Sequence, residues 1–126
     1  MGRWLFVWGP AVSLMAAIFA VSSVPNLDTT SSGISDKTLH FWTYGALGVL
    51  LVRALAGAAW TGVTSRAASL AWVMAVAWGA LDEWHQSTVP GRSLSGRDLV
   101  ADAIGAALAV AVVLLAARRR RGGRAV

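Results

Sequence analysis

The chain has 126 residues, of which 56% are hydrophobic and only 13% are charged, and its formal net charge is +5. A soluble core of this length could not bury so many apolar side chains, so the composition predicts a single membrane domain over residues 1–126. The positive charge does not indicate nucleic-acid binding, because the basic residues lie in short loops and a terminal run, and the lack of cysteine excludes disulfides and thiolate sites.

Four windows of the sequence are long and apolar enough to cross a bilayer, which requires about 20 residues. They predict helices over residues 4–24, 37–60, 67–86 and 98–117, and therefore an all-α bundle of four transmembrane helices. The first window could also be a signal peptide. It is longer than the usual h-region of about 7 to 15 residues and no clear A-x-A site follows it, so a retained anchor is favoured.

The lysines and arginines predict the orientation of this bundle. With cytoplasmic N and C termini, most of the basic residues lie inside, as the positive-inside rule requires, and all six acids lie at or near the outer side. The basic tail over 118–126 is typical of stop-transfer charge and an anchor to anionic lipid. We therefore predict a multi-pass protein of the cell membrane, with the bilayer as its partner and no nucleic acid.

Polar residues recur at helical spacing at one end of three predicted helices. The second helix carries three of them at i, i+3 and i+7, and the third and fourth each carry an i, i+4 pair. Because ionisable groups in membranes face the bundle interior or a water-filled cavity, these stripes predict one shared pocket that faces outward. The candidate ligand-binding residues are Lys37, His40, Tyr44, Asp82, Glu83, Gln86, Arg92, Asp98 and Asp102.

The loop between the third and fourth predicted helices contains a turn signal. Pro90 and Gly91 suit positions i+1 and i+2 of a type II turn, and Ser95 or Gly96 can begin the last helix. The turn would hold Arg92 over the acids. There it could pair with one of them, or its forked donors could take a phosphate or carboxylate of a ligand.

The same residues allow several kinds of chemistry. His40 could act as a general base or acid with a carboxylate orienting it, so the catalytic candidates are His40, Asp82 and Glu83, although no G-x-S-x-G elbow surrounds the nearby serines. The competing interpretation is a hydrogen-bonded plug that fixes helix register. The carboxylates of Asp82, Glu83, Asp98 and Asp102 offer oxygens for Mg²⁺ or Ca²⁺, and His40 or His85 could add a nitrogen for a transition metal. No strong metal signature is present, so no metal site or cofactor is assigned. Whether the protein is an enzyme stays open.

Two blocks of the sequence resemble the VanZ-like family of small bacterial membrane proteins. They are DKTLHFWTYGALGVLL and DEWHQSTVPGRSLSGRDLVADAIGAALA, which agree with the family pattern in order and spacing from about Asp36 to Leu115. Asp102 departs from the pattern, because asparagine is common there. The resemblance carries the family positions onto Asp36, Lys37, His40, Tyr44, Asp82, Glu83, Gln86, Pro90, Arg92, Asp98, Asp102 and Gly105.

This resemblance implies a role in the cell envelope and, for the family, an association with low-level resistance to the glycopeptide teicoplanin. With the predicted pocket, it favours a protein that binds or acts on an envelope component, such as a lipid-linked or phosphate-bearing headgroup or a glycopeptide. One alternative is a membrane-embedded hydrolase or transferase acting on a lipid headgroup. A small proton-coupled transporter is less favoured, because the first predicted helix offers only serines and no ionisable residue near mid-membrane.

Overall fold

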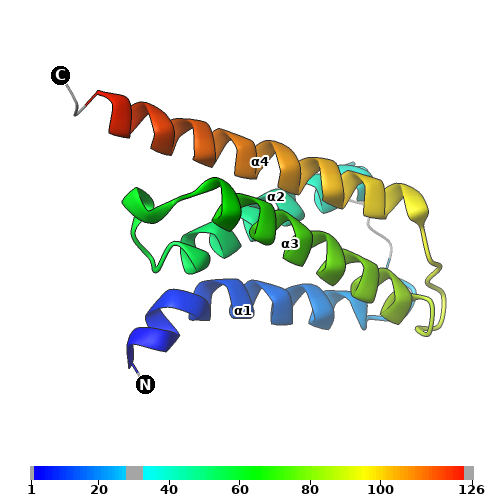
Figure 1. The fold of residues 1–126 in the computed structure, drawn as a ribbon. Helices are drawn as coiled ribbons and strands as arrows, with labels where there is room; N and C mark the ends of the chain where they lie inside the picture. The colour runs from blue at the N-terminus through cyan, green and yellow to red at the C-terminus, as the bar shows by residue number, and fades with distance from the viewer. Residues whose placement is uncertain (1, 28–32, 124–126) are drawn as a thin grey trace.

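The computed structural model describes residues 2–27 and 33–123, and within them the chain forms four long α-helices. Figure 1 shows α2 and α3 lying between α1 and α4, with the start of α1 and the end of α4 at the same end of the molecule. The predicted all-α fold is thus confirmed. The elements are α1 (Gly2–Ser22), α2 (Asp36–Leu55), the short 3-10 helix η2 (Trp60–Gly62), α3 (Ser65–Gln86) and α4 (Gly96–Gly122).

The second helix is shorter than the sequence predicted. It ends at Leu55 rather than at residue 60. Gly57 and Ala58 adopt left-handed backbone with φ of +67° and 64°, which an α-helix cannot continue. The prediction for this boundary was wrong because the apolar composition of the segment continues past the point where its backbone turns.

The fourth helix is longer than predicted, since it continues through most of the basic tail. Arg118 donates a hydrogen bond to Ser65 Oγ at 2.8 Å, and Arg121 donates to the carbonyl oxygen of Thr61 at 3.3 Å. These two bonds tie the basic end of α4 to the segment that begins α3.

Hydroxyl side chains begin three of the helices. Ser35, Thr64 and Ser95 each accept a hydrogen bond from the backbone N–H three residues further along the chain. Ser95 therefore begins α4, as the sequence predicted. Asp36 and Asp98 lie in the first turns of α2 and α4, where the helix dipole favours negative charge. The caps formed by Ser35 and Ser95 thus place Asp36 and Asp98 at the same end of the bundle.

Among the described helices, α1, α2 and α4 are long and apolar enough to span a membrane. The 22-residue α3 does not belong to this group, because its last turns carry Asp82, Glu83, His85 and Gln86. Three of the four predicted spans are therefore supported as candidates. Large apolar side chains such as Trp42, Leu108 and Val112 remain exposed on the outside of the bundle, where surrounding lipid would cover them.

Small residues bring three helices together at the depth of the polar side chains. A Cβ atom at Gly105 would overlap the carbonyl group of Phe41, and one at Gly45 would lie 3.3 Å from the Gly105 carbonyl oxygen. On α3, a Cβ atom at Gly79 would lie 2.8 Å from Asp102 Oδ2. Because these positions lack side chains, the backbones approach closely and polar groups from different helices reach one another.

Candidate functional site

Two contacts join α2 to α4 at the end where both helices begin. His40 Nδ1 lies 2.8 Å from Asp102 Oδ1, and Lys37 Nζ lies 3.2 Å from Asp98 Oδ1. The Asp102 side chain is fully buried and that of His40 is 10% exposed, whereas Lys37 is 51% exposed. The buried carboxylate therefore fixes the orientation of the imidazole, whereas the lysine that pairs with Asp98 is half exposed.

A second set of bonds runs along α3 to the loop that follows it. Gln86 Nε2 donates to Asp82 Oδ2 at 2.9 Å and to Ser22 Oγ at 3.2 Å, and Arg92 donates to Gln86 Oε1 at 2.7 Å. The predicted i, i+4 pair of Asp82 and Gln86 is thus a direct contact. It also fastens α3 to the last residue of α1.

Arg92 has one side-chain partner among the described residues. Within residues 2–27 and 33–123 it forms no ion pair with an acid, and its partner is the neutral amide of Gln86. A guanidinium group has five N–H donors, and the described residues supply one side-chain acceptor to it, Gln86 Oε1.

The loop after α1 packs onto the predicted turn. The Arg92 N–H donates to the Val89 carbonyl oxygen at 3.1 Å and Gly91 has a φ of +77°, both of which agree with the predicted type II turn. The Asn26 N–H donates to the Pro90 carbonyl oxygen at 3.1 Å, and a Cβ atom at Gly91 would overlap the Asn26 side chain. This contact fixes the turn that carries Arg92, and nothing in the sequence indicated it.

Glu83 joins α3 to the start of α4. Its side chain is buried, and its Oε2 accepts a hydrogen bond of 2.6 Å from the backbone N–H of Ser95. It is therefore in a position to hold the N-terminal cap of α4 in place.

Glu83→Ala should lower the free energy of unfolding by about 1–3 kcal/mol, because the partly buried Ser95 N–H would lose its acceptor. Glu83→Gln keeps an acceptor oxygen at the same position and should cost less. Thermal unfolding in detergent, followed by circular dichroism, measures both. Equal losses in the two variants would contradict this role.

The interior of the polar region holds buried polar atoms that are not hydrogen-bonded within the described residues. Buried oxygens of Tyr44, Asp82, Glu83 and Asp102 have no hydrogen-bond partner among the described residues. The Tyr44 ring is buried and lies parallel to that of His40, with 6.2 Å between the ring centroids. Because buried unpaired acceptors are costly, the carboxylate oxygens of this region favour a donor or a cation beside them.

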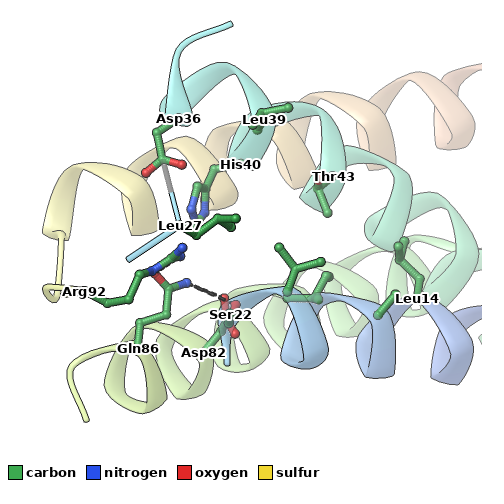
Figure 2. Close-up of a pocket in the computed structure, with 13 residues that line it drawn as sticks. Leu14, Ser22, Leu27, Asp36, Leu39, His40, Thr43, Asp82, Gln86 and Arg92 are labelled. Atoms are coloured by element: carbon green, nitrogen blue, oxygen red, sulfur yellow. Dashed lines mark hydrogen bonds between the residues drawn. The ribbon is translucent and has the colours of Figure 1, made fainter. Parts of the chain in front are cut away.

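A cavity of about 290 Å³ opens beside these groups, between α1, α2 and α3. Figure 2 shows Asp36, His40 and Arg92 gathered at one end of it and Leu14 at the other. Its polar lining residues are Ser22, Asp36, His40, Thr43, Asp82, Gln86 and Arg92, and its apolar ones are Leu14, Ala17, Ile18, Val21, Leu27 and Leu39.

Only part of the predicted set faces this cavity. His40, Asp82, Gln86 and Arg92 line it. The remaining candidates stand behind it or beside it: Lys37, Tyr44, Glu83, Asp98 and Asp102. Nothing in the sequence had placed α1 in the site, although α1 forms much of the apolar wall. The one available signal was Ser22, a polar residue at the end of an apolar helix.

The sequence profile of the VanZ/LLP1 family matches residues 7–117, from α1 to the last turns of α4. The chain belongs to the VanZ/LLP1 family. No curated protein and no solved structure matched it. The predicted resemblance is thus confirmed, and the match also covers α1, which the two sequence blocks did not. With three candidate spans, this VanZ/LLP1 protein is a multi-pass integral protein of the cell membrane.

Proposed function

We propose that this VanZ/LLP1 protein binds a membrane amphiphile whose headgroup carries a phosphate, such as a lipid-linked envelope precursor. The observation that carries the proposal is the place of Arg92, which lines the cavity at its polar end and bonds the neutral amide of Gln86 among the described residues, while α1 supplies an apolar wall. A guanidinium fork matches the oxygens of a phosphate. The headgroup would lie at the Arg92 end, and the first carbons of the chain would lie along Leu14 and Ile18.

The size of the cavity supports this kind of ligand. A volume of about 290 Å³ is near the lower end of the range for small-molecule pockets, about 300–1,000 Å³. It accommodates a headgroup and a short part of an apolar chain, and a longer chain would continue into the surrounding lipid. A protein that binds such a precursor could also influence the response to teicoplanin, as the family resemblance implies.

Binding to the purified protein in detergent tests this proposal. We expect a polyisoprenyl phosphate to bind at least about tenfold more tightly than the polyisoprenol with the same chain, because only the phosphate engages Arg92. Native mass spectrometry or intrinsic tryptophan fluorescence measures both ligands. If the two lipids bind with equal affinity, the site does not recognise the phosphate. If neither lipid binds saturably, the protein does not bind this kind of amphiphile.

The proposed membrane arrangement has α3 as a fourth span, cytoplasmic termini and the cavity on the outer side. It is supported by the arginines near the ends of the chain and by the positive-inside rule. Because the chain has no cysteine, single-cysteine variants report on it directly. In intact cells, a membrane-impermeant maleimide should label Ser93→Cys, whereas Thr61→Cys should react only after permeabilisation. Labelling of both in intact cells would mean that α3 does not cross the membrane.

A second candidate function is hydrolysis or transfer at the headgroup of the bound lipid. It is favoured by His40, which lines the cavity while the buried Asp102 holds its Nδ1. A histidine oriented in this way is suited to general acid–base catalysis. Release of phosphate from the polyisoprenyl phosphate, lost in His40→Ala, would support the enzyme. Saturable binding without release would support a receptor.

A further inference from the structure

We propose that Asp36, His40 and Asp98 bind a divalent transition-metal ion such as Zn²⁺ at the polar end of the cavity. Each of the three offers one ligand atom, and these atoms lie within 4.8 Å of one another. Two carboxylates and one imidazole form a mixed oxygen and nitrogen set, which suits first-row transition metals better than Mg²⁺. The sequence had indicated Asp98 and His40 as possible ligands, and the structure adds Asp36 to them.

The surroundings of His40 support ligation. Its Nδ1 is held by Asp102 Oδ1 at 2.8 Å, and its Nε2 has no hydrogen-bond partner within the described residues. Histidines that bind metals almost always have their other ring nitrogen bonded to a carboxylate or carbonyl, which fixes the ring and makes it more basic. The fully buried Asp102 supplies such a partner, so Nε2 is the nitrogen left for the metal.

The charges around the site also favour a cation. Asp36, Asp98 and Asp102 lie together here, with Asp82 and Glu83 on the neighbouring helix. The bases beside these acids in the described part of the site are Lys37, His40 and Arg92, with Arg97 exposed beyond them. The acids outnumber these bases, so a divalent ion would add positive charge where negative charge is concentrated.

Lys37 is a competitor for this position. Its Nζ lies 3.2 Å from Asp98 Oδ1, and Asp98 itself is only 5% exposed, with no hydrogen bond to that oxygen in the described residues. The ammonium group occupies the kind of position that a metal cation would take. Since the lysine side chain is half exposed and flexible, it can turn outward when a divalent ion binds.

A metal ion bound by these three residues would keep a coordination position on the side of the cavity. Asp36 and His40 both line the cavity, so three protein ligands would leave a coordination position directed into it. In zinc sites, such an open position is occupied by water or by a ligand oxygen. This inference goes beyond lipid binding, because the ion would bind with the cavity free of any amphiphile.

Isothermal titration of the full chain in detergent with Zn²⁺, free of any histidine tag, tests the site. We expect one ion per chain and much weaker binding of Mg²⁺. Asp36→Asn, His40→Ala and Asp98→Asn should each weaken Zn²⁺ binding by at least about tenfold, and Asp102→Asn by about 10- to 100-fold. His85→Ala is the matched control, because the other histidine of the chain bonds Ser23 and does not belong to the set.

Lys37→Gln should change Zn²⁺ binding in the direction opposite to that of a folding defect. Removing the competing ammonium should tighten Zn²⁺ binding by at least about threefold, because a like charge next to the ligands is lost. Arg92→Gln should leave Zn²⁺ binding in place, which separates this site from the phosphate proposal. Absence of stoichiometric Zn²⁺ binding in both the natural chain and Lys37→Gln would overturn the site. So would equal binding in His40→Ala and His85→Ala.

Discussion

Arg92→Gln is expected to remove the preference for a phosphorylated lipid, lowering its affinity by about 10- to 100-fold while the affinity for the matching alcohol hardly changes. The reason is that hydrogen bonds to a charged group contribute about 1.5–3 kcal/mol, and glutamine offers neither the charge nor the fork. Arg92→Lys keeps the charge without the planar donors, so its affinity for the phosphorylated lipid should lie between those of the natural chain and Arg92→Gln. The two lipids are titrated under identical detergent conditions.

The control for this experiment is Arg97→Gln. Arg97 lies in the first turn of α4 at the same end of the bundle, but it is exposed and does not line the cavity between α1, α2 and α3. Its loss should leave the affinity ratio of the two lipids unchanged. If Arg92→Gln also leaves that ratio unchanged, the headgroup does not reach Arg92 and the proposed site is wrong.

Gly105→Leu is expected to disrupt the bundle, with a loss of at least about 3 kcal/mol in the free energy of unfolding. Even the first carbon of a side chain there would overlap the Phe41 carbonyl group, and an α2 backbone cannot move aside as a flexible side chain could. Thermal unfolding in detergent measures the loss. The separated helices would also carry His40 away from Asp102.

Gly9→Leu is the matched substitution. Gly9 also lies inside a helix, α1, but a Cβ atom there would have no heavy atom within 4 Å. Leucine is a better helix former than glycine, so this variant should be as stable as the natural protein or more so. Should Gly105→Leu unfold at the same temperature as Gly9→Leu, the close approach of α2 and α4 would not exist in the membrane protein.

The helices themselves could be predicted because each apolar window has to satisfy its own backbone hydrogen bonds in lipid. The ends of the helices were harder to predict. The end of α2 depends on the backbone angles of Gly57 and Ala58, which hydropathy does not report. The extension of α4 depends on Arg118 and Arg121 finding acceptors on a distant segment. Apolar composition therefore located the helices, but local and long-range contacts decided where they stop.

For the candidate site, helical spacing predicted contacts within one helix better than contacts between helices. The Asp82 and Gln86 pair follows directly from i, i+4 geometry. The partners of Arg92 and His40 depend on how helices pack, and sequence reasoning left them open. The apolar wall formed by α1 was missed because lipid-facing and cavity-facing leucines look alike in a sequence.

Different helices form the parts of the cavity wall that would contact the tail and the headgroup of the proposed ligand. α1 supplies Leu14, Ile18 and Val21, whereas α4 supplies none of the lining and contributes acids behind it. The first helix would thus determine the selectivity for tail length and branching. The later segments would determine the selectivity for the headgroup. A chimaera that exchanges only Gly2–Ser22 for the equivalent stretch of another VanZ/LLP1 protein would then retune the hydrocarbon tail and preserve the ionic centre.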